Sequence, residues 1–374
     1  MGLRPDRIEN HARQKRWGEQ KVESHLSVVE DTEVIPADHE HSHIVNADRT
    51  VPFEQTIRDF KAALARRCNF KVRPRRYYGT IWISDCYTDY KNPRMLRRYE
   101  GPLSEGEALR TMGKGLNKAQ VSAGALAEGI ERLSVFHRIE SGEPTPIYEL
   151  TEDLTLVPVT LPDDLIEHLN ETVDGVSAGN NVLECVLHGL LEMYEHLDVC
   201  LHLGRFGLGH REFIDPGLTG FHPLVAEKML AVAVPGENPN VTTIHAIVCP
   251  RDIGPFVRSC AHLDGKIALQ RAFNETVQSH KTRSVRDLQS FRPDYHVTEL
   301  QNNHSDDLET NILTVLQGLP DKVYVQDWTD PIMKVPVMRP FTMRMLETKP
   351  NEHLIGDYVQ SLMTESANYI DWNA

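Results

Sequence analysis

Two segments of this sequence repeat one arrangement of glutamates on an apolar helical frame. Glu128 and Glu131 stand three residues apart in LAEGIER, and Glu192 and Glu195 repeat that spacing in LLEMYEH. Residues three apart lie on the same face of a helix, so each pair projects from one side. The apolar neighbours predict that both helices are buried. If the two helices face each other, four carboxylates share one pocket.

Carboxylates on a buried face cannot stay ionised without compensation. Divalent cations offset their mutual repulsion, and ligand sets made of hard oxygen atoms select Mg²⁺. Two magnesium ions on four glutamates would form a clamp for a polyphosphate. The alternative is a solvated helix face with a salt bridge to a nearby arginine, which is the usual explanation for a single such pair. The second copy favours the shared metal site.

Two glycine-containing segments precede these helices. DGVSAGNN (174–181) allows a tight turn and offers Asn180 or Asn181 as a helix cap, and backbone N–H groups at a helix start suit a phosphate. An ordinary cap is the alternative, although Glu184 on the same helix strengthens the phosphate hypothesis. GKG (113–115) precedes the first helix, and Lys114 could reach a phosphate. The sequence has no Walker A motif.

Composition excludes several classes of protein. The net charge of -14 argues against general nucleic-acid or membrane-surface binding, and no apolar run is long enough to span a membrane. The six cysteines form no CxxC pair, which argues against a disulfide framework and a thiolate zinc site. The charged start of the chain does not resemble a signal peptide. We therefore expect a cytoplasmic protein.

Hydrophobic patterning predicts one large α+β domain over residues 51–374 behind a flexible, polar N-terminal arm over residues 1–50. The arm carries the histidine-rich stretch HEHSH (39–43). Strands and helices mix without a βαβ rhythm. We expect helices at 53–64, 118–137, 181–196 and 266–280, and strands at 77–84, 154–159, 199–203, 229–234, 243–249, 322–326 and 335–339.

The order of these motifs resembles the YcaO family. GKGLNKAQVSAGALAEGIERLS is similar to the family's glycine-lysine-glycine lead and ExxER helix, and NETVDGVSAGNNVLECVLHGLLEMYEH to its second glutamate helix. AHLDGKIALQRAFNETVQSHKTRSVRD resembles a later family helix, and KVYVQDWTDPIMKVPVMRP a strand-turn-strand. The resemblance covers residues 110 to 340, about 60% of the chain.

The resemblance implies a single large YcaO-like domain with mixed sheets and long buried helices around a nucleotide site. It implies ATP and Mg²⁺ as cofactors, with Glu128, Glu131, Glu192 and Glu195 as the metal-binding and catalytic carboxylates. Ser177, Asn180 and Glu184 would contact the nucleotide, and Lys114, Glu275, Gln278 and Arg286 the phosphates. The expected activity is phosphorylation of a peptide backbone amide oxygen, leading to an azoline, an amidine or a thioamide.

Some positions depart from the family pattern. His196 replaces an arginine, His280 stands where an arginine is common, and the tail NYIDWNA lacks the proline-rich end of azoline-forming members. A histidine is only partly charged near neutral pH, so a phosphate contact there would weaken or depend on pH.

The sequence also leads to expectations about partners. We expect a peptide or protein substrate, a separate leader-binding or TfuA-like partner protein and, from the resemblance, a homodimer. Two alternatives stay open: a non-catalytic subunit that binds ATP or a peptide, and a two-metal phosphohydrolase.

Overall fold

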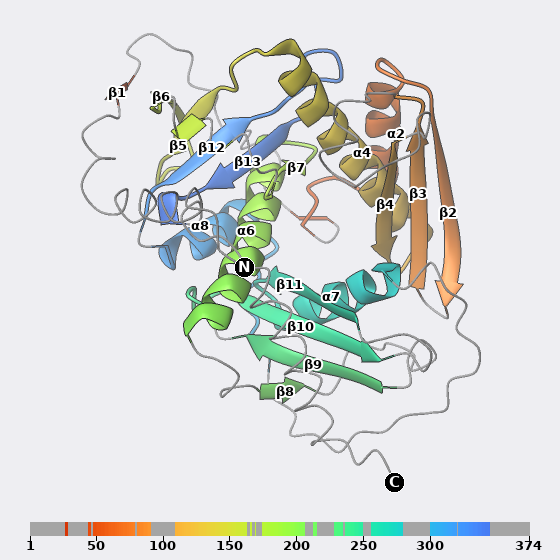
Figure 1. Cartoon of the computed structure of the whole chain (residues 1–374), viewed down its shortest axis with the longest axis vertical. Coiled ribbons are helices and arrows are strands. Elements are labelled where there is room, and N and C mark those ends of the chain that lie inside the picture. Colours follow the sequence, from red (N-terminus) through yellow and green to blue (C-terminus); the bar gives the residue numbers. More distant parts are fainter. Residues whose placement is uncertain are drawn as a thin grey trace, which may run out of the picture.

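The computed structural model describes residues 27–28, 44–45, 48–78, 81–90, 109–162, 165–166, 169, 174–205, 212–214, 228–234, 236–249, 256–279, 300–319 and 321–344. Helices and antiparallel sheets mix in it, which confirms the predicted α+β class (Figure 1). The helices in these ranges are α2 (Phe53–Leu64), α4 (Lys118–Ser141), α6 (Val182–Arg205), α7 (Gly265–Ser279) and α8 (Leu308–Gln317).

Three sheets surround the two long helices. The strands of the six-stranded sheet, in spatial order, are β1 (Ser27–Val28), β6 (Leu156–Thr160), β5 (Ile147–Leu150), β12 (Val323–Asp327), β13 (Val337–Phe341) and β7 (Ser177–Ala178). The four-stranded sheet contains β11 (Phe256–His262), β10 (Thr242–Cys249), β9 (Lys228–Val234) and β8 (Glu212–Ile214). The three-stranded sheet contains β2 (Phe70–Tyr78), β3 (Ile81–Thr88) and β4 (Arg110–Gly115).

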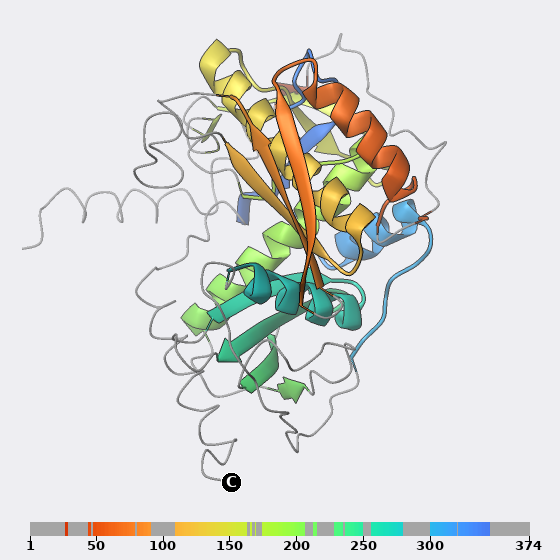
Figure 2. The same cartoon turned by 90° about the vertical axis from the view of Figure 1, so that its right-hand side faces the viewer.

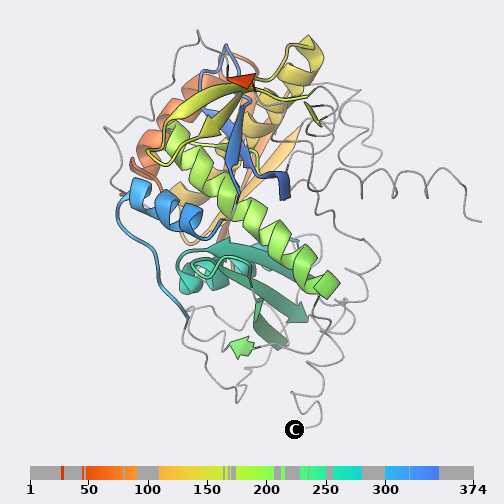
Figure 3. The same ribbon diagram turned by 90° about the vertical axis from the view of Figure 1, so that its left-hand side faces the viewer.

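Each sheet buries its apolar face under helices. Helix α6 packs on β13 and runs on to the four-stranded sheet, so that it connects the two (Figure 3). Helix α4 covers the three-stranded sheet and α2 packs against α4, and α7 covers β10 and β11 (Figure 2). Three hydrophobic clusters match these layers. The long helices therefore lie between sheets, where a polar stripe on either one is shielded from bulk water.

The sequence of α6 explains how it presents such a stripe. Leucines at helical spacing, among them Leu183, Leu187 and Leu190, are fully or almost fully buried against the six-stranded sheet. His188, Glu192 and Glu195 follow one another at four- and three-residue steps, so they share a different face. The side chain of Asn181 caps the helix by accepting a hydrogen bond from the Glu184 N–H at 2.8 Å.

Most predicted elements are confirmed, but two are wrong. The segment 77–84 is not one strand: it contains the end of β2 and the start of β3, where Tyr78 pairs with Ile81. The segment 199–203 is the last part of α6, because a short apolar run fits a buried helix as well as a strand. The sequence patterns did not predict β1, β4, β5, β7, β8, β11, α8 or most of β2. No helix in the described part of the chain has the length and apolar character needed to cross a membrane.

The last residues of the predicted N-terminal arm pack into the protein. Asp48, Arg49 and Thr50 are buried directly before α2, and the Ile44 N–H donates to the Asp306 carbonyl at 2.7 Å. The division of the chain at residue 50 stays a prediction. The histidine-rich stretch 39–43 lies outside the described residues.

Candidate functional site

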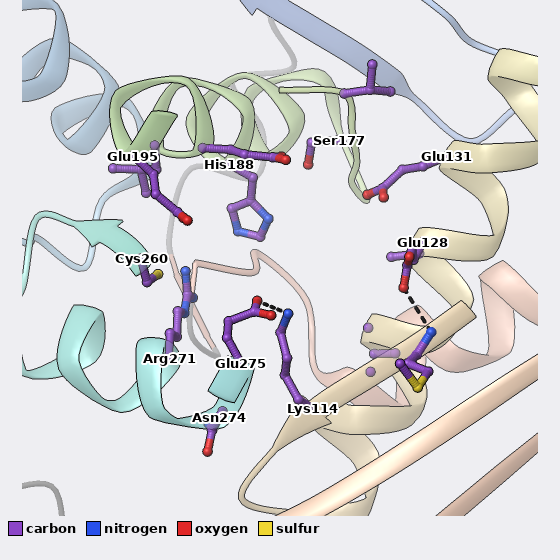
Figure 4. Close-up of a pocket in the computed structure, with 18 of the residues that line it drawn as sticks. Lys114, Glu128, Glu131, Ser177, His188, Glu195, Cys260, Arg271, Asn274 and Glu275 are labelled. Carbon is purple, nitrogen blue, oxygen red and sulfur yellow. Dashed lines mark hydrogen bonds and ion pairs between the residues drawn. The ribbon is translucent and has the colours of Figure 1, made fainter. Parts of the chain in front are cut away.

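A polar cavity of about 620 Å³ lies where the long helices meet the sheets (Figure 4). Its walls come from β4, α4, α6, β11 and α7, together with the loop that leads to β7 and the segment before α2. Residues far apart in the sequence therefore share one space. The size suits a nucleotide-sized ligand.

Glu128, Glu131, Glu192 and Glu195 all line this cavity. Figure 4 shows Glu128 and Glu131 entering from α4, with Glu195 on α6 at the opposite side. This confirms the predicted meeting of the two glutamate pairs. Glu128 accepts a hydrogen bond from the Met112 N–H at 2.9 Å, and Glu131 accepts one from the Ala178 N–H at 2.8 Å. These backbone donors fix the carboxylates of α4 against β4 and β7.

Burial and neighbouring carboxylates disfavour the charged forms of Glu131 and Glu192. Burial in the cavity wall, together with the charges of Glu128 and Glu192, raises the pKa of Glu131 to about 8. Burial raises the pKa of Glu192 to about 7, and the charge of Glu195 adds to this effect. At neutral pH these values keep Glu131 mostly protonated and Glu192 about half protonated when no cation is bound, and a cation would displace these protons. A set of four carboxylate oxygen ligands in this condition fits divalent cations with oxygen preference, of which Mg²⁺ is one.

Lys114 and Glu275, two predicted phosphate residues, also line the cavity and form an ion pair with each other (Figure 4). Lys114 lies on β4, and not in a loop before the helix. Gly113 is a glycine for packing reasons: a Cβ there would lie 2.0 Å from the Val121 carbonyl oxygen of α4. The glycine therefore lets β4 press against α4, and this places Lys114 beside the glutamates.

Arg271 is a cavity residue that the sequence analysis missed. It lies on α7 one turn before Glu275, and Figure 4 shows both residues, with Asn274, on the side of the cavity opposite α6. The spacing of four residues in RAFNE is the signal that could have found it, since residues four apart share a helix face. Lys114 and Arg271 bring positive charge to the side of the cavity that faces the glutamates of α6.

Ser177 lines the cavity, but the two other predicted nucleotide residues lie behind its wall. Glu184 is fully buried and accepts hydrogen bonds from the Asn180 N–H at 2.8 Å, the Thr50 N–H at 2.6 Å and Arg49 at 3.0 Å. These protein donors occupy the carboxylate. Arg49 does line the cavity, so Glu184 can act on a ligand by holding that arginine.

His196 lines the cavity one residue after Glu195 and forms an ion pair with Asp174 at 3.7 Å. Burial opposes its protonation, but the carboxylate of Asp174 and the charges of Glu192 and Glu195 raise its pKa to about 9. At neutral pH the imidazole is therefore protonated. In its surroundings this histidine carries the positive charge that an arginine would supply.

The remaining predicted residues are less well placed. Gln278 lies on α7, but the structure describes only its backbone, and Arg286 and His280 lie outside the described residues. Their predicted roles stay predictions.

Known proteins resemble this chain in sequence and in fold. The sequence model described as YcaO cyclodehydratase, ATP- and Mg²⁺-binding, matches residues 145–341, just over half of the chain. No curated protein matches the sequence significantly. The structure of YcaO from Methanopyrus kandleri bound with AMPPCP and Mg²⁺ is similar, with 19% identity and a TM-score of 0.59, over 80% of this chain and 94% of that one.

A heterocyclase in complex with substrate and cofactor is similar too, with 15% identity and a TM-score of 0.58. The match covers 84% of this chain but 54% of the heterocyclase, so this chain spans about half of its length. At such identities the two solved structures show a shared fold.

Proposed function

This chain belongs to the YcaO family, whose cofactors are ATP and Mg²⁺, and on this premise we propose that it phosphorylates the oxygen of a peptide backbone amide. The observation that carries the proposal is the cavity itself. Four glutamates from two helices face Lys114 and Arg271 across a space of about 620 Å³. A triphosphate with its metal ions needs such a combination of oxygen ligands and cations.

In this proposal, Glu128 and Glu131 on α4 and Glu192 and Glu195 on α6 hold Mg²⁺. When bound, the metal would neutralise phosphate charge and align the γ-phosphate. Lys114, Arg271 and His196 bind the anionic phosphates, and Glu275 fixes the ammonium group of Lys114. Ser177 contacts the nucleotide, and Asn180 and Glu184 support the site through Arg49. Gln278 and Arg286 keep their proposed place near the phosphates.

The proposed reaction needs no enzyme nucleophile. A thiol, hydroxyl, amine or sulfide adds to the amide carbon and loses its proton, and the amide oxygen becomes an oxyanion. This oxygen bonds to the γ-phosphorus of ATP while ADP leaves. Cleavage of the carbon–oxygen bond then releases phosphate, and loss of a proton from nitrogen gives an azoline or an amidine, whereas loss of the remaining sulfide proton gives a thioamide. The residues of the chain orient the reactants and stabilise charge.

Cys260 illustrates why a cysteine nucleophile is not part of the proposal. Its side chain lines the cavity, but burial and the charge of Glu195 raise the pKa of the thiol to about 12. The reactive thiolate is then scarce at neutral pH. The nucleophile in this proposal comes from the substrate or from a delivered sulfide.

We further propose that the substrate is a ribosomally made peptide or protein and that a separate protein presents it. That separate protein would be a leader-binding or TfuA-like partner.

Oxygen tracing tests the proposed reaction. A candidate peptide carrying ¹⁸O at its backbone carbonyl is incubated with the protein, partner fractions from the source cells, ATP and Mg²⁺, and the released phosphate is analysed by mass spectrometry. Amide activation puts the peptide's ¹⁸O into phosphate. A phosphohydrolase would instead take oxygen from ¹⁸O-labelled water without any peptide. ATP binding without turnover in every mixture would favour a non-catalytic subunit.

A further inference from the structure

A buried carboxylate lies behind the cavity wall and contacts one of its arginines. Asp48 has no exposed surface, and its carboxylate accepts a hydrogen bond from Arg271 at 2.6 Å. The same carboxylate lies 3.1 Å from Nε2 of His262 and 3.0 Å from Nε2 of His304. Its backbone φ of 68° is unfavourable for a residue with a side chain. Such strain persists where the surroundings fix the residue firmly.

The hydrogen bonds around His262 determine what this cluster does. Its Nδ1 accepts a hydrogen bond from the Asp264 N–H at 2.9 Å, so in the neutral ring the proton is on Nε2. Burial lowers the pKa of His262, which favours that neutral ring. His262 is therefore a donor to Asp48.

Asp48, His262 and His304 also have the composition of a metal site, with ligand atoms within 4.8 Å of one another. The proton on Nε2 of His262 and the guanidinium of Arg271 both compete with a cation. The arrangement therefore suits a carboxylate that is held in place by donors and that holds an arginine in turn.

The Asp48–Thr50 segment also reaches the opposite wall of the cavity. Arg49 pairs with Glu184 of α6 at 3.0 Å, and the N–H and hydroxyl of Thr50 donate to the same carboxylate at 2.6 and 2.7 Å. Three consecutive residues thus connect α7, through Arg271, with α6, through Glu184. The segment fixes two arginines, Arg49 and Arg271, that line the cavity.

We propose that Asp48, held by His262 and His304, is a positioning residue that fixes Arg271 for the polyphosphate of ATP. The inference rests on the proposed function in taking the cavity as the ATP site. A free arginine side chain loses rotamer freedom when it binds a ligand, whereas Arg271 is already ordered. Asp48 thereby raises affinity for the charged part of the nucleotide without touching it.

Calorimetric titration of Asp48→Asn with MgATP and with AMP tests this role. We expect ATP affinity to fall about tenfold while AMP affinity changes less than about twofold, because AMP lacks the two terminal phosphates. Asp330→Asn is the matched control, since Asp330 is equally buried and pairs with Arg67 at 2.6 Å away from the cavity. It should lower thermal stability and leave ATP affinity unchanged.

A double-mutant cycle shows whether Asp48 acts through Arg271. In an Arg271→Met background, Asp48→Asn should cost no further ATP affinity. Full additivity, equal losses for ATP and AMP, or an unchanged ATP affinity in Asp48→Asn would each overturn the proposal. If the wild-type protein itself binds no ATP, the proposed function fails first, and this outcome is distinct from the others.

Hydrogen exchange of the wild-type protein covers the case in which Asp48→Asn does not fold. Because binding and ordering are linked, ATP should slow amide exchange in residues 48–50 and around His304 more than AMP does. Equal protection by both nucleotides would contradict the positioning role. If the purified protein retains a stoichiometric zinc or nickel ion that Asp48→Asn loses, the cluster is a metal site and the positioning role is wrong.

Discussion

Glu131 should destabilise the metal-free protein, and Glu131→Gln should reveal by how much. Its pKa is about 8 in the folded protein and about 4.5 in the unfolded chain, so the folded state binds more protons between these values. Stability of the metal-free protein therefore falls as pH rises from about 4.5 to about 8. Glutamine resembles the protonated side chain, and its oxygen can still accept the Ala178 N–H.

The size of the effect follows from the pKa difference. At about 1.4 kcal/mol for each tenfold change in proton affinity, the upper bound at pH 8 is about 5 kcal/mol. The cavity admits water and counterions, which screen the charge, so we expect a gain of about 1–2 kcal/mol at pH 8. At pH 5 the gain should be below about 1 kcal/mol, because this pH lies only about half a unit above the pKa of the unfolded chain and little of the total difference has accumulated.

Urea denaturation of the metal-free protein at pH 5, 6.5 and 8 measures this gain. Glu149→Gln is the control: its carboxylate pairs with Lys322 at 2.8 Å outside the cavity, and the change should stay within about 0.5 kcal/mol. With saturating MgATP at pH 8, the wild type should become more stable than Glu131→Gln, because the ligand stabilises the wild type more. A variant that is less stable than the wild type at pH 8 without metal would refute the electrostatic reasoning.

Three further substitutions test other parts of the site. Lys114→Met should weaken MgATP binding about tenfold in calorimetry, whereas Lys322→Met at the surface should not; equal affinities would exclude a phosphate role for Lys114. His196→Arg should bind ATP within about twofold of the wild-type affinity at pH 7, but only the wild-type affinity should fall as pH rises through about 9, because the imidazole then loses its proton. A wild-type affinity that does not change with pH would exclude His196 from the ATP site. Gly113→Ala should lower the free energy of unfolding in urea by about 2–3 kcal/mol, because its Cβ would lie 2.0 Å from the Val121 oxygen. An unchanged denaturation midpoint would mean that β4 does not pack closely against α4.

The helical part of the site could be predicted because its signals are local. The paired glutamates share a helix face by spacing alone, and the apolar residues around them indicate burial. The shared cavity was predicted because two helices carry the same glutamate spacing among similar apolar residues. Glu275 and Lys114 were found for a different reason, through the order of motifs along the chain.

The rest depends on contacts between residues that are distant in sequence. Asp48 and Arg271 are 223 residues apart, and Arg49 and Glu184 are 135 apart, so no spacing reveals either pair. The charge of His196 likewise depends on Asp174, which tertiary structure brings to 3.7 Å. Strand β4 was missed because two glycines lower strand propensity, although packing against α4 requires one of them.

Calorimetric titration of ATP into the wild type and Glu192→Gln, with and without Mg²⁺, tests most directly whether the four glutamates form a magnesium–nucleotide site. We predict that the wild type binds ATP at least about tenfold more tightly with Mg²⁺ and that Glu192→Gln loses this dependence. ATP binding that ignores Mg²⁺ in the wild type, or a Glu192→Gln variant with the wild-type response, would contradict the assignment of the cavity.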